Sequence, residues 1–366
     1  MRAHRRGILG AALVLVVALA GCAAGPSGSS SEPIADGAPL VPLEQLDVLS
    51  DPFAHEGPST AILHDSVIEP VMTNPAQSLP TTVQSADLGG ASTVTVTDTS
   101  RVIAIDLAGS LAATVWGLGF GDTLIARDQS TTFPGAVDLP PATSGGHSVN
   151  AEAIIALRPT LVITDGTVGP RDVLEQLREV GITVVFVEHE SSFAGAQKLA
   201  GDVAAIYGAP EAGRLLAEQI GNEIAEVEQA IARFAPEPGL RMMFLYLRGG
   251  SGVYYLFGEE SGGDDLIHAL GGIDVAGEIG WRGMQPITDE ATVAANPDLI
   301  LVMTDGLVSV GGVDGLLDEI PAIALTTAGK HRRFVDMADG QILSFGPRSA
   351  GVVDALARAI YAPDSE

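Results

Sequence analysis

Cysteine, aromatic residues and basic residues are all scarce in this chain of 366 residues. A single cysteine leaves no partner for an intramolecular disulfide and no site built from several cysteine ligands. Lysine and arginine number 19 against 46 acidic residues, so the formal net charge is -27. Because binding to phosphates requires a basic surface, this balance argues against nucleic acid as a partner.

Long apolar runs are also missing, apart from one near the amino terminus. Arg2, Arg5 and Arg6 precede an apolar run over residues 8–20, which is short for a bilayer span and typical of a secretory signal. The run ends at Cys22, directly after Leu-Ala-Gly. This pattern resembles the lipobox of bacterial lipoproteins and implies a signal peptide over 1–22 with lipidation of Cys22. An ordinary signal peptide with an incidental cysteine is the alternative.

Residues 23–89 are rich in Pro, Ser, Gly and acidic residues and show no sustained helical or strand period. Such a composition predicts a flexible tether. His55 and His64 lie in this tract, and isolated histidines in polar sequence are usually exposed. A metal site there is the alternative interpretation.

From residue 90 onward, apolar strand patterns alternate with helical patterns, which is typical of parallel α/β sheets. We predict an amino-terminal α/β lobe over 90–208 and a carboxyl-terminal α/β lobe over 237–362. The length of the chain is sufficient for two such domains.

One long helix is predicted between the lobes, over residues 209–236. Apolar residues recur there at spacings of three and four and form one stripe, whereas the acidic residues fall mostly elsewhere. Pro210 can begin the helix and Pro236 ends it. A single stiff helix would therefore connect the two lobes.

A short unit occurs once in each lobe, over residues 150–166 and 288–306. In both copies a glutamate, Glu152 or Glu290, stands three residues or fewer from the start of a short helix, and the unit ends in Thr-Asp-Gly. A helix start favours a negative charge, so a purely structural role for both glutamates is one interpretation.

This combination of features is similar to the helix-linked class, class III, of ABC-transporter substrate-binding proteins, which serve haem, siderophore and cobalamin importers. The resemblance covers roughly residues 90–362. It implies two Rossmann-like lobes joined by one interdomain helix, which is the class III periplasmic-binding-protein fold. It also implies that Glu152 and Glu290 dock on basic residues of the permease, where opposite charges fix orientation.

Within that class, two motifs resemble the HmuT-type haem-binding lipoproteins. The motif Gly-Gly-His-Ser-Val-Asn contains His147, and the motif Tyr-Leu-Arg-Gly-Gly contains Tyr246 and Arg248. The resemblance implies that His147 and Tyr246 ligate haem iron. Many other haem-binding relatives use a tyrosine of the first lobe, but the first lobe here offers only Tyr207, late in a helix.

The chemistry of Tyr246 agrees with this resemblance. Ferric iron suits an anionic phenolate, and imidazole is a common axial ligand of haem. A phenol is protonated at neutral pH, so a nearby cation is needed to favour the phenolate. Arg248 lies two residues further along an extended strand and faces the same side. The alternatives are a core tyrosine, a loop histidine at 147 and a surface arginine.

Three further residues, Trp281, Arg282 and Met284, precede the helix of Glu290 as His147 precedes that of Glu152. We expect them to support the ligand, Arg282 at a haem propionate and Trp281 or Met284 at a porphyrin face.

The sequence therefore predicts a lipid-anchored, monomeric protein on the extracellular face of the cell membrane, which binds haem as transported cargo and catalyses no reaction. Its expected partners are an ABC permease with its ATPase and upstream haem-binding surface proteins, and it touches the membrane only through its lipid. A ferric siderophore or cobalamin is the alternative cargo. A secreted hydrolase or lyase is a remote alternative, because the chain lacks Gly-x-Ser-x-Gly and His-Glu-x-x-His motifs.

Overall fold

The computed structural model describes residues 40–364 except 88, 146 and 250–252. The predicted signal peptide, the lipidation site Cys22 and the first part of the predicted tether therefore lie outside the described residues. Within the part of the chain that is described, none of the helices combines the length and apolarity that a bilayer crossing requires.

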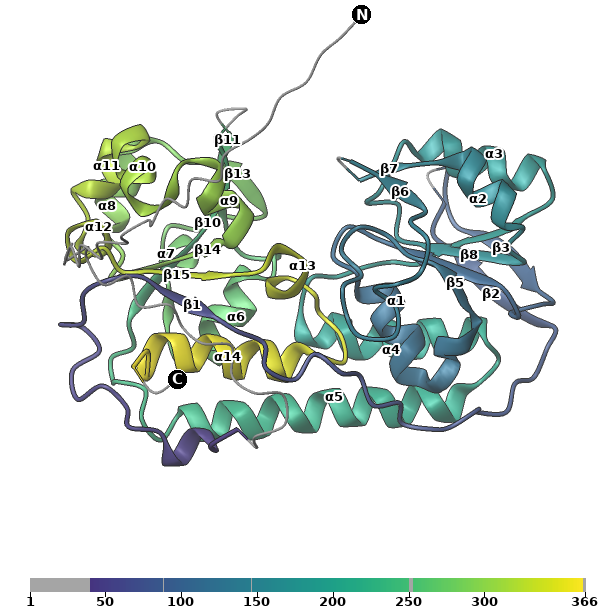
Figure 1. Ribbon diagram of the computed structural model, residues 1–366, viewed down its shortest axis with the longest axis horizontal. Helices are drawn as coiled ribbons and strands as arrows, with labels where there is room; N and C mark the ends of the chain where they lie inside the picture. The colour runs from purple at the N-terminus through teal and green to yellow at the C-terminus, as the bar shows by residue number, and fades with distance from the viewer. Residues whose placement is uncertain (1–39, 88, 146, 250–252, 365–366) are drawn as a thin grey trace, which may run out of the picture. The chain divides into compact units, whose positions relative to one another are not determined.

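The first lobe is built on a parallel four-stranded sheet in the order β5-β4-β8-β9 (Figure 1). Nearly all residues of these strands are buried, as expected for a parallel sheet covered on both faces. The strands are β4 (Val102–Ile105), β5 (Leu124–Ala126), β8 (Leu161–Thr164) and β9 (Thr183–Phe186). The connections contain η2 (Trp116–Phe120), η3 (Gly121–Thr123), α1 (Ser110–Val115), α2 (Ala151–Leu157), α3 (Arg171–Glu179) and α4 (Phe193–Ile206), and the short hairpin β6 (Thr143–Ser144) and β7 (Ser148–Val149).

The second lobe is built on a mixed seven-stranded sheet in the order β1-β15-β14-β10-β11-β13, with β12 also paired to β10. Its strands are β10 (Arg241–Arg248), β11 (Val253–Phe257), β12 (Ile273–Asp274), β13 (Met284–Pro286), β14 (Leu299–Met303), β15 (Phe334–Met337) and β1 (Ser59–Ala61). Its helices are α6 (Gly263–Ala269), α7 (Val275–Glu278), α8 (Asp289–Ala295), α9 (Thr304–Ser309), α10 (Gly312–Glu319), α11 (Pro321–Ala324), α12 (Thr327–His331), α13 (Asp339–Ile342) and α14 (Ser349–Tyr361).

Strand β10 passes through the middle of this sheet and is buried on both faces over most of its length. Met242 and Phe244 belong to one apolar cluster, whereas Met243, Leu245 and Leu247 belong to the cluster on the opposite face. This alternation is the period-two geometry of a strand. The continuous apolar run that begins the strand is therefore core on both sides.

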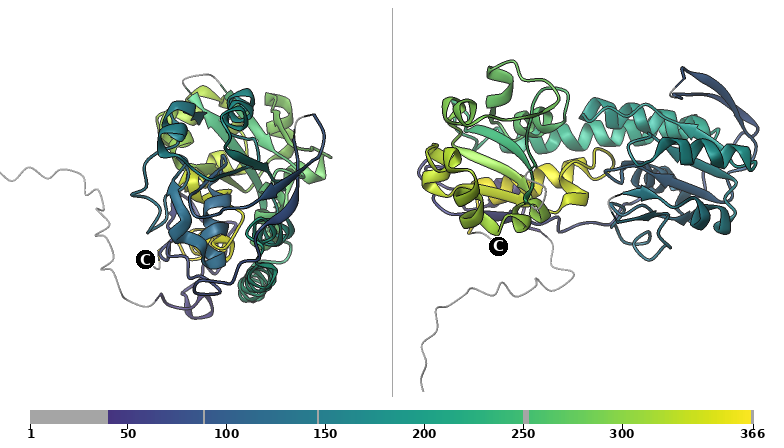
Figure 2. Two further views of the ribbon diagram at one scale, coloured as in Figure 1. Left: turned by 90° about the vertical axis from the view of Figure 1, so that its right-hand side faces the viewer. Right: turned by 90° about the horizontal axis from the view of Figure 1, so that it is seen from above.

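Helix α5 (Pro210–Ile231) joins the lobes, as the sequence predicts. It packs along α4 of the first lobe and along α14 of the second lobe (Figures 1 and 2). Four residues of the predicted stripe are buried, Leu216, Ile220, Ile224 and Ile231, and Ala212, Gly213 and Ala230 are buried with them. The regular helix ends at Ile231 rather than at 236, because the chain turns there ahead of Pro236.

The later part of the predicted tether contains regular structure, which corrects the prediction of a flexible segment up to residue 89. Strand β1 pairs in parallel with β15 of the second lobe. Further along, the N–H of Val71 donates to Gly117 of the first lobe, at 2.9 Å. A short 3-10 turn, η1 (Leu43–Gln45), precedes β1. The segment is held by backbone hydrogen bonds to partners that are distant in sequence. Local periodicity in the sequence therefore does not reveal its structure.

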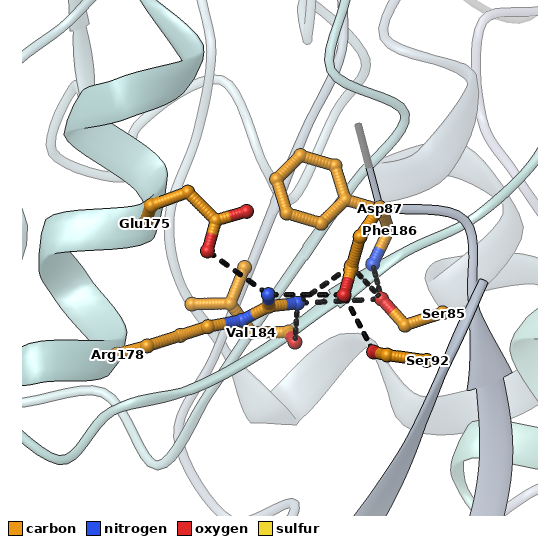
Figure 3. A network of polar contacts seen from close by, with 7 residues as sticks. All are labelled: Ser85, Asp87, Ser92, Glu175, Arg178, Val184 and Phe186. Atoms are coloured by element: carbon orange, nitrogen blue, oxygen red, sulfur yellow. Dashed lines mark hydrogen bonds and ion pairs between the residues drawn. The ribbon is translucent and has the colours of Figure 1, made fainter. Parts of the chain in front are cut away.

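An antiparallel hairpin of β2 (Thr81–Ser85) and β3 (Ser92–Val96) follows this segment. A polar network fastens it to the first lobe (Figure 3). In this network Arg178 of α3 donates to Asp87, with an Nη2–Oδ1 distance of 2.8 Å, and Ser85 and Ser92 also donate to that carboxylate. Burial alone would raise the pKa of Asp87, but these hydrogen bonds outweigh it and lower its pKa to about 2.

The two lobes also contact each other directly beside α5. The N–H of Phe193, at the start of α4, donates to Asp265 of α6 at 2.7 Å. The ring of Phe193 lies edge-on to Phe345 at a centroid distance of 5.4 Å. The guanidinium of Arg348, which precedes α14, lies over the ring of Phe133 at 5.5 Å. The interdomain helix is thus one of several connections between the lobes.

Candidate functional site

Strand β10 ends in a tyrosine and an arginine that lie against each other. The Cζ atom of Arg248 is 4.7 Å from the ring centroid of Tyr246, which is within the range of a cation–π contact. Tyr246 is half-buried, and its ring also lies edge-on to Phe257 at 6.2 Å. The predicted placement of Arg248 on the same side as Tyr246 is therefore confirmed.

The register of the neighbouring strands shows which residues share this sheet face. Tyr246 is directly opposite Tyr255 of β11, and Tyr255 is directly opposite Pro286 of β13. Directly opposed residues of antiparallel strands point to the same face. Met284 lies opposite Phe257 by the same register and is 48% exposed. Met284 is therefore on the face of Tyr246, as its predicted supporting role requires.

Trp281 lies elsewhere. It packs against the apolar cluster that contains Leu245 and Leu247, on the sheet face opposite Tyr246. Trp281 was expected to cover a porphyrin face beside Tyr246, but it lies on the other face of the sheet. Trp281 precedes β13, and its N–H donates to the carbonyl of Ala276 at 2.9 Å, a contact that the sequence pattern does not specify.

Arg282 is an exposed residue engaged with acidic side chains. Its guanidinium pairs with Glu260 and is 4.0 Å from Glu259. Its predicted contact with a haem propionate stays a prediction.

His147 occupies the turn between β6 and β7 in the first lobe. Its φ angle is 59°, a left-handed conformation that is uncommon for residues other than glycine and enriched for histidine. Its ring atom Nδ1 is buried and has no hydrogen-bond partner among the described residues. Such a buried polar atom is costly unless something satisfies it. Gly146 of the same motif lies outside the described residues.

The predicted repeat has the same local structure in both lobes. Asn150 accepts a hydrogen bond from the N–H of Ala153 at 3.0 Å and caps α2, and Thr288 likewise caps α8 through Ala291 at 3.2 Å. Both helices end at a left-handed residue, Arg158 or Asn296, and both lead into a buried strand.

Glu152 and Glu290 occupy the same first-turn position of these helices and are exposed. Each is followed three residues later by an exposed apolar side chain, Ile155 or Val293, each 41% exposed. Residues three apart share a helix face. Glu290 also lines a groove of about 620 Å³ between α8 and α11. Both glutamates are thus accessible to a partner.

Tyr207, the tyrosine of the first lobe, has a structural role. Tyr207 is fully buried, stacks on Phe120 at a centroid distance of 4.1 Å, and shares a hydrogen bond with Thr123. Burial raises its pKa above the ordinary value. The sequence-based choice of His147 rather than Tyr207 as the ligand candidate of this lobe is consistent with that placement.

Two buried carboxylates, Asp106 and Asp128, follow the ends of β4 and β5. Their oxygens accept backbone N–H groups, among them those of Ser110 and Thr131. Burial, reinforced by the neighbouring carboxylates Asp128 and Asp165, raises the pKa of Asp106. No group of three or more His, Cys, Asp or Glu side chains in the described ranges is arranged to hold a metal ion.

Comparison with known proteins identifies the family. The family model described as periplasmic binding protein matches residues 105–339. The chain belongs to the periplasmic binding protein family. A curated member, the uncharacterized ABC transporter substrate-binding lipoprotein YvrC of Bacillus subtilis, is 28% identical over 255 residues, covering 68% of this chain and 76% of YvrC. A cobalamin-binding protein of Halobacterium salinarum is 26% identical over 52% of this chain and 51% of its own length.

Solved structures of this family include close matches. The crystal structure of the heme binding protein HmuT is 39% identical, with a TM-score of 0.78, and covers 86% of this chain and 100% of that chain. The periplasmic heme-binding protein RhuT from Roseiflexus sp. RS-1 is 35% identical, with a TM-score of 0.65, over 73% of this chain and 99% of its own. The predicted fold class and the resemblance to HmuT-type proteins are therefore confirmed.

Two residues of this region were missed or undervalued by sequence reasoning. Tyr255 shares the face of Tyr246, and only the strand register reveals this. Asp339 forms an ion pair with Arg248 from 91 residues away, and no sequence signal connects the two.

Proposed function

We propose that this protein is an extracellular, lipid-anchored substrate-binding protein that captures haem between its lobes and delivers it to an ABC importer. The observation that carries the proposal is the stack of Arg248 on Tyr246 at the end of β10. Tyrosine binds ferric iron through its oxygen with a negative charge, and a cation beside the ring complements that charge. Binding and release, without a chemical reaction, are the whole of the proposed task.

The histidine supports the same proposal. HmuT crystal structures include variants with a histidine, a tyrosine or an arginine replaced by alanine. The three substituted positions are separated along HmuT by the same numbers of residues as His147, Tyr246 and Arg248 are here. We therefore assign His147 and Tyr246 as axial ligands of haem iron, with Arg248, Arg282 and Met284 as supporting residues.

A haemin titration followed by absorption spectroscopy tests this assignment. The wild-type protein is expected to shift the Soret band, and Tyr246→Phe or His147→Ala to lower haemin affinity by about a hundredfold, at the upper end of what disturbing a metal site costs. Tyr254→Phe is the matched control, since Tyr254 lies on the adjacent strand and packs on the other sheet face. Unchanged spectra in both ligand variants would remove the assignment.

Cobalamin is the second candidate cargo, because several relatives are described as cobalamin- or vitamin B12-binding proteins. Cobalamin brings its cobalt with corrin ligands and needs no phenolate from the protein. Competition of cyanocobalamin and of ferric siderophores against bound haemin distinguishes the cargoes. Displacement of haemin by cobalamin at equal concentration would favour the second candidate.

We further propose that Glu152 and Glu290 dock the protein on its permease, as their matched and exposed positions suggest. The double variant Glu152→Arg with Glu290→Arg is expected to keep haemin binding and to abolish haem uptake by cells, because the charge complementarity is reversed at both lobes. Glu179→Arg with Glu228→Arg changes the net charge equally at exposed positions elsewhere. Normal uptake by the first pair would contradict docking.

Membrane attachment through Cys22 completes the proposal. The lipobox motif supports it, and YvrC is itself described as a lipoprotein. Cys22→Ala is expected to release the protein into the medium, which immunoblotting of cell and medium fractions would measure.

A further inference from the structure

Arg248 is held in place by an acidic residue from another part of the second lobe. Its Nη2 lies 2.8 Å from Oδ2 of Asp339, at the start of α13. Its Nη1 donates to the carbonyl of Leu247 at 2.9 Å. These contacts fix the end of a long side chain that would otherwise retain several rotamers. The guanidinium therefore has a defined position over the ring of Tyr246.

Asp339 is itself well anchored. Its Oδ1 accepts the N–H of Asp305 at 2.9 Å, and its side chain is only 20% exposed. Both carboxylate oxygens thus have partners, one from α9 and one from β10. Asp339 connects the end of the strand that carries Tyr246 to the Thr-Asp-Gly tripeptide that ends the repeat unit of this lobe.

The tripeptide also leaves room for the guanidinium. A Cβ atom on Gly306 would lie 3.3 Å from Nη1 of Arg248 and 3.0 Å from the carbonyl oxygen of Leu247. Both distances are tighter than ordinary van der Waals contact. The glycine therefore permits the close approach of Arg248 to α9.

We propose that Asp339 is a positioning residue that holds Arg248 over Tyr246 and thereby strengthens the ligation of ferric haem by Tyr246. The inference rests on the proposed function. Asp339 also carries a charge that opposes the effect of Arg248. Solvent partly screens that opposing charge, since the Arg248 side chain is 36% exposed. Displacement of the guanidinium from the ring of Tyr246 is therefore expected to have the larger effect on haem binding.

These two effects predict opposite signs, which makes the proposal testable. If Asp339 positions Arg248, Asp339→Ala weakens haemin binding, by about tenfold for the loss of one charged hydrogen bond. If Asp339 only neutralises Arg248, the same substitution tightens binding. The spectroscopic signature is the ferric–phenolate band in resonance Raman spectra, which is expected to weaken in Asp339→Ala and to recover in Asp339→Glu.

A double-mutant cycle completes the experiment. Once Arg248→Ala has removed the group that is positioned, adding Asp339→Ala is expected to cost no further affinity. Asp305→Ala is the matched control, because it removes a neighbouring exposed carboxylate that forms no hydrogen bond or ion pair with Arg248 in the described part of the chain.

Additive losses in the cycle, an unchanged Raman band, or tighter binding by Asp339→Ala would each overturn the proposal. Failure of the proposed function is a different result. In that case wild-type protein gives no Soret shift, or Tyr246→Phe leaves the spectrum unaltered, whatever happens at Asp339.

Discussion

Two arginines in different lobes each contact an aromatic ring, a carboxylate and a backbone carbonyl, but they differ in their roles. Arg178 lies over the ring of Phe186 at 5.3 Å, donates to Asp87 at 2.8 Å and donates to the carbonyl of Val184 at 2.9 Å (Figure 3). Phe186 is only 1% exposed. The bonds from Arg178 to Asp87 and Val184 fasten a hairpin to the sheet, so the network acts on stability.

Arg248 repeats this arrangement with a ring at 4.7 Å, a carboxylate at 2.8 Å and a backbone carbonyl at 2.9 Å. The ring is that of Tyr246, which is half-buried and carries a phenol. Tyr246 differs from Phe186 by its hydroxyl and its partial exposure, and the iron ligand that we propose requires both. The comparison teaches that an arginine, an aromatic ring and a carboxylate do not by themselves indicate a binding site.

The largest expected effect separates the two arginines. Arg178→Ala is expected to lower the free energy of unfolding by about 3 kcal/mol, because it leaves the mostly buried Asp87 carboxylate without its cation. Arg248→Ala is expected to change stability by less than about 1 kcal/mol and to lower haemin affinity. Urea unfolding and haemin titration measure both. Equal destabilisation by the two variants would break the comparison.

A smaller effect concerns pH. The folded pKa of Asp87, about 2, lies below the unfolded value of about 3.9. Its carboxylate therefore stabilises the fold above pH 4, and this contribution is lost as the pH falls toward 2. Asp87→Asn is expected to cost about 1–2 kcal/mol at pH 7.

The cost of Asp87→Asn should shrink between pH 4 and pH 2, as the wild-type carboxylate is protonated. Urea unfolding of both proteins across this window measures the difference between them, so that other titrating groups cancel. A difference that is constant with pH would mean that Asp87 contributes through shape rather than charge.

Much of the fold follows from the sequence because its strands are buried on both faces and read as continuous apolar runs. The stripe of α5 and the capped helices of Glu152 and Glu290 were also predictable, because helix periodicity and capping residues are local signals. Strand β1 was not, because its three residues gain their bonds from β15, far along the chain. Local pattern cannot detect a strand whose stability is supplied by its partner.

The candidate site divides in the same way. The common face of Tyr246 and Arg248 follows from the period of one strand. The position of Trp281 depends on its backbone bonds to Ala276 and Glu259, and that of Asp339 depends on the connection from β15 to α13. Both positions are set by tertiary structure rather than by local sequence. Local sequence pattern therefore indicates the residues that we propose as ligands, whereas the residues that hold them in place depend on the tertiary structure.

The smallest expected effect tests how tightly Arg248 is held, without changing any charge. Gly306→Ala places a methyl group 3.3 Å from Nη1 of Arg248, so the guanidinium must shift by a few tenths of an ångström. We expect haemin affinity to fall about threefold, equivalent to about 0.6 kcal/mol. Alanine has the higher helix propensity, but the added methyl group also lies 3.0 Å from the carbonyl oxygen of Leu247, so we expect little net change in stability.

Gly201→Ala in α4 is the matched control, because no atom lies within 4 Å of the added Cβ there. It should raise stability by up to about 1 kcal/mol and leave haemin affinity unchanged. If Gly306→Ala behaves like this control in both measurements, Arg248 tolerates displacement, and its charge matters more than its position. If haemin affinity falls while stability changes little, haem binding depends on the position of the Arg248 guanidinium to within a few tenths of an ångström. The corresponding guanidinium of Arg178, over Phe186, serves only the fold.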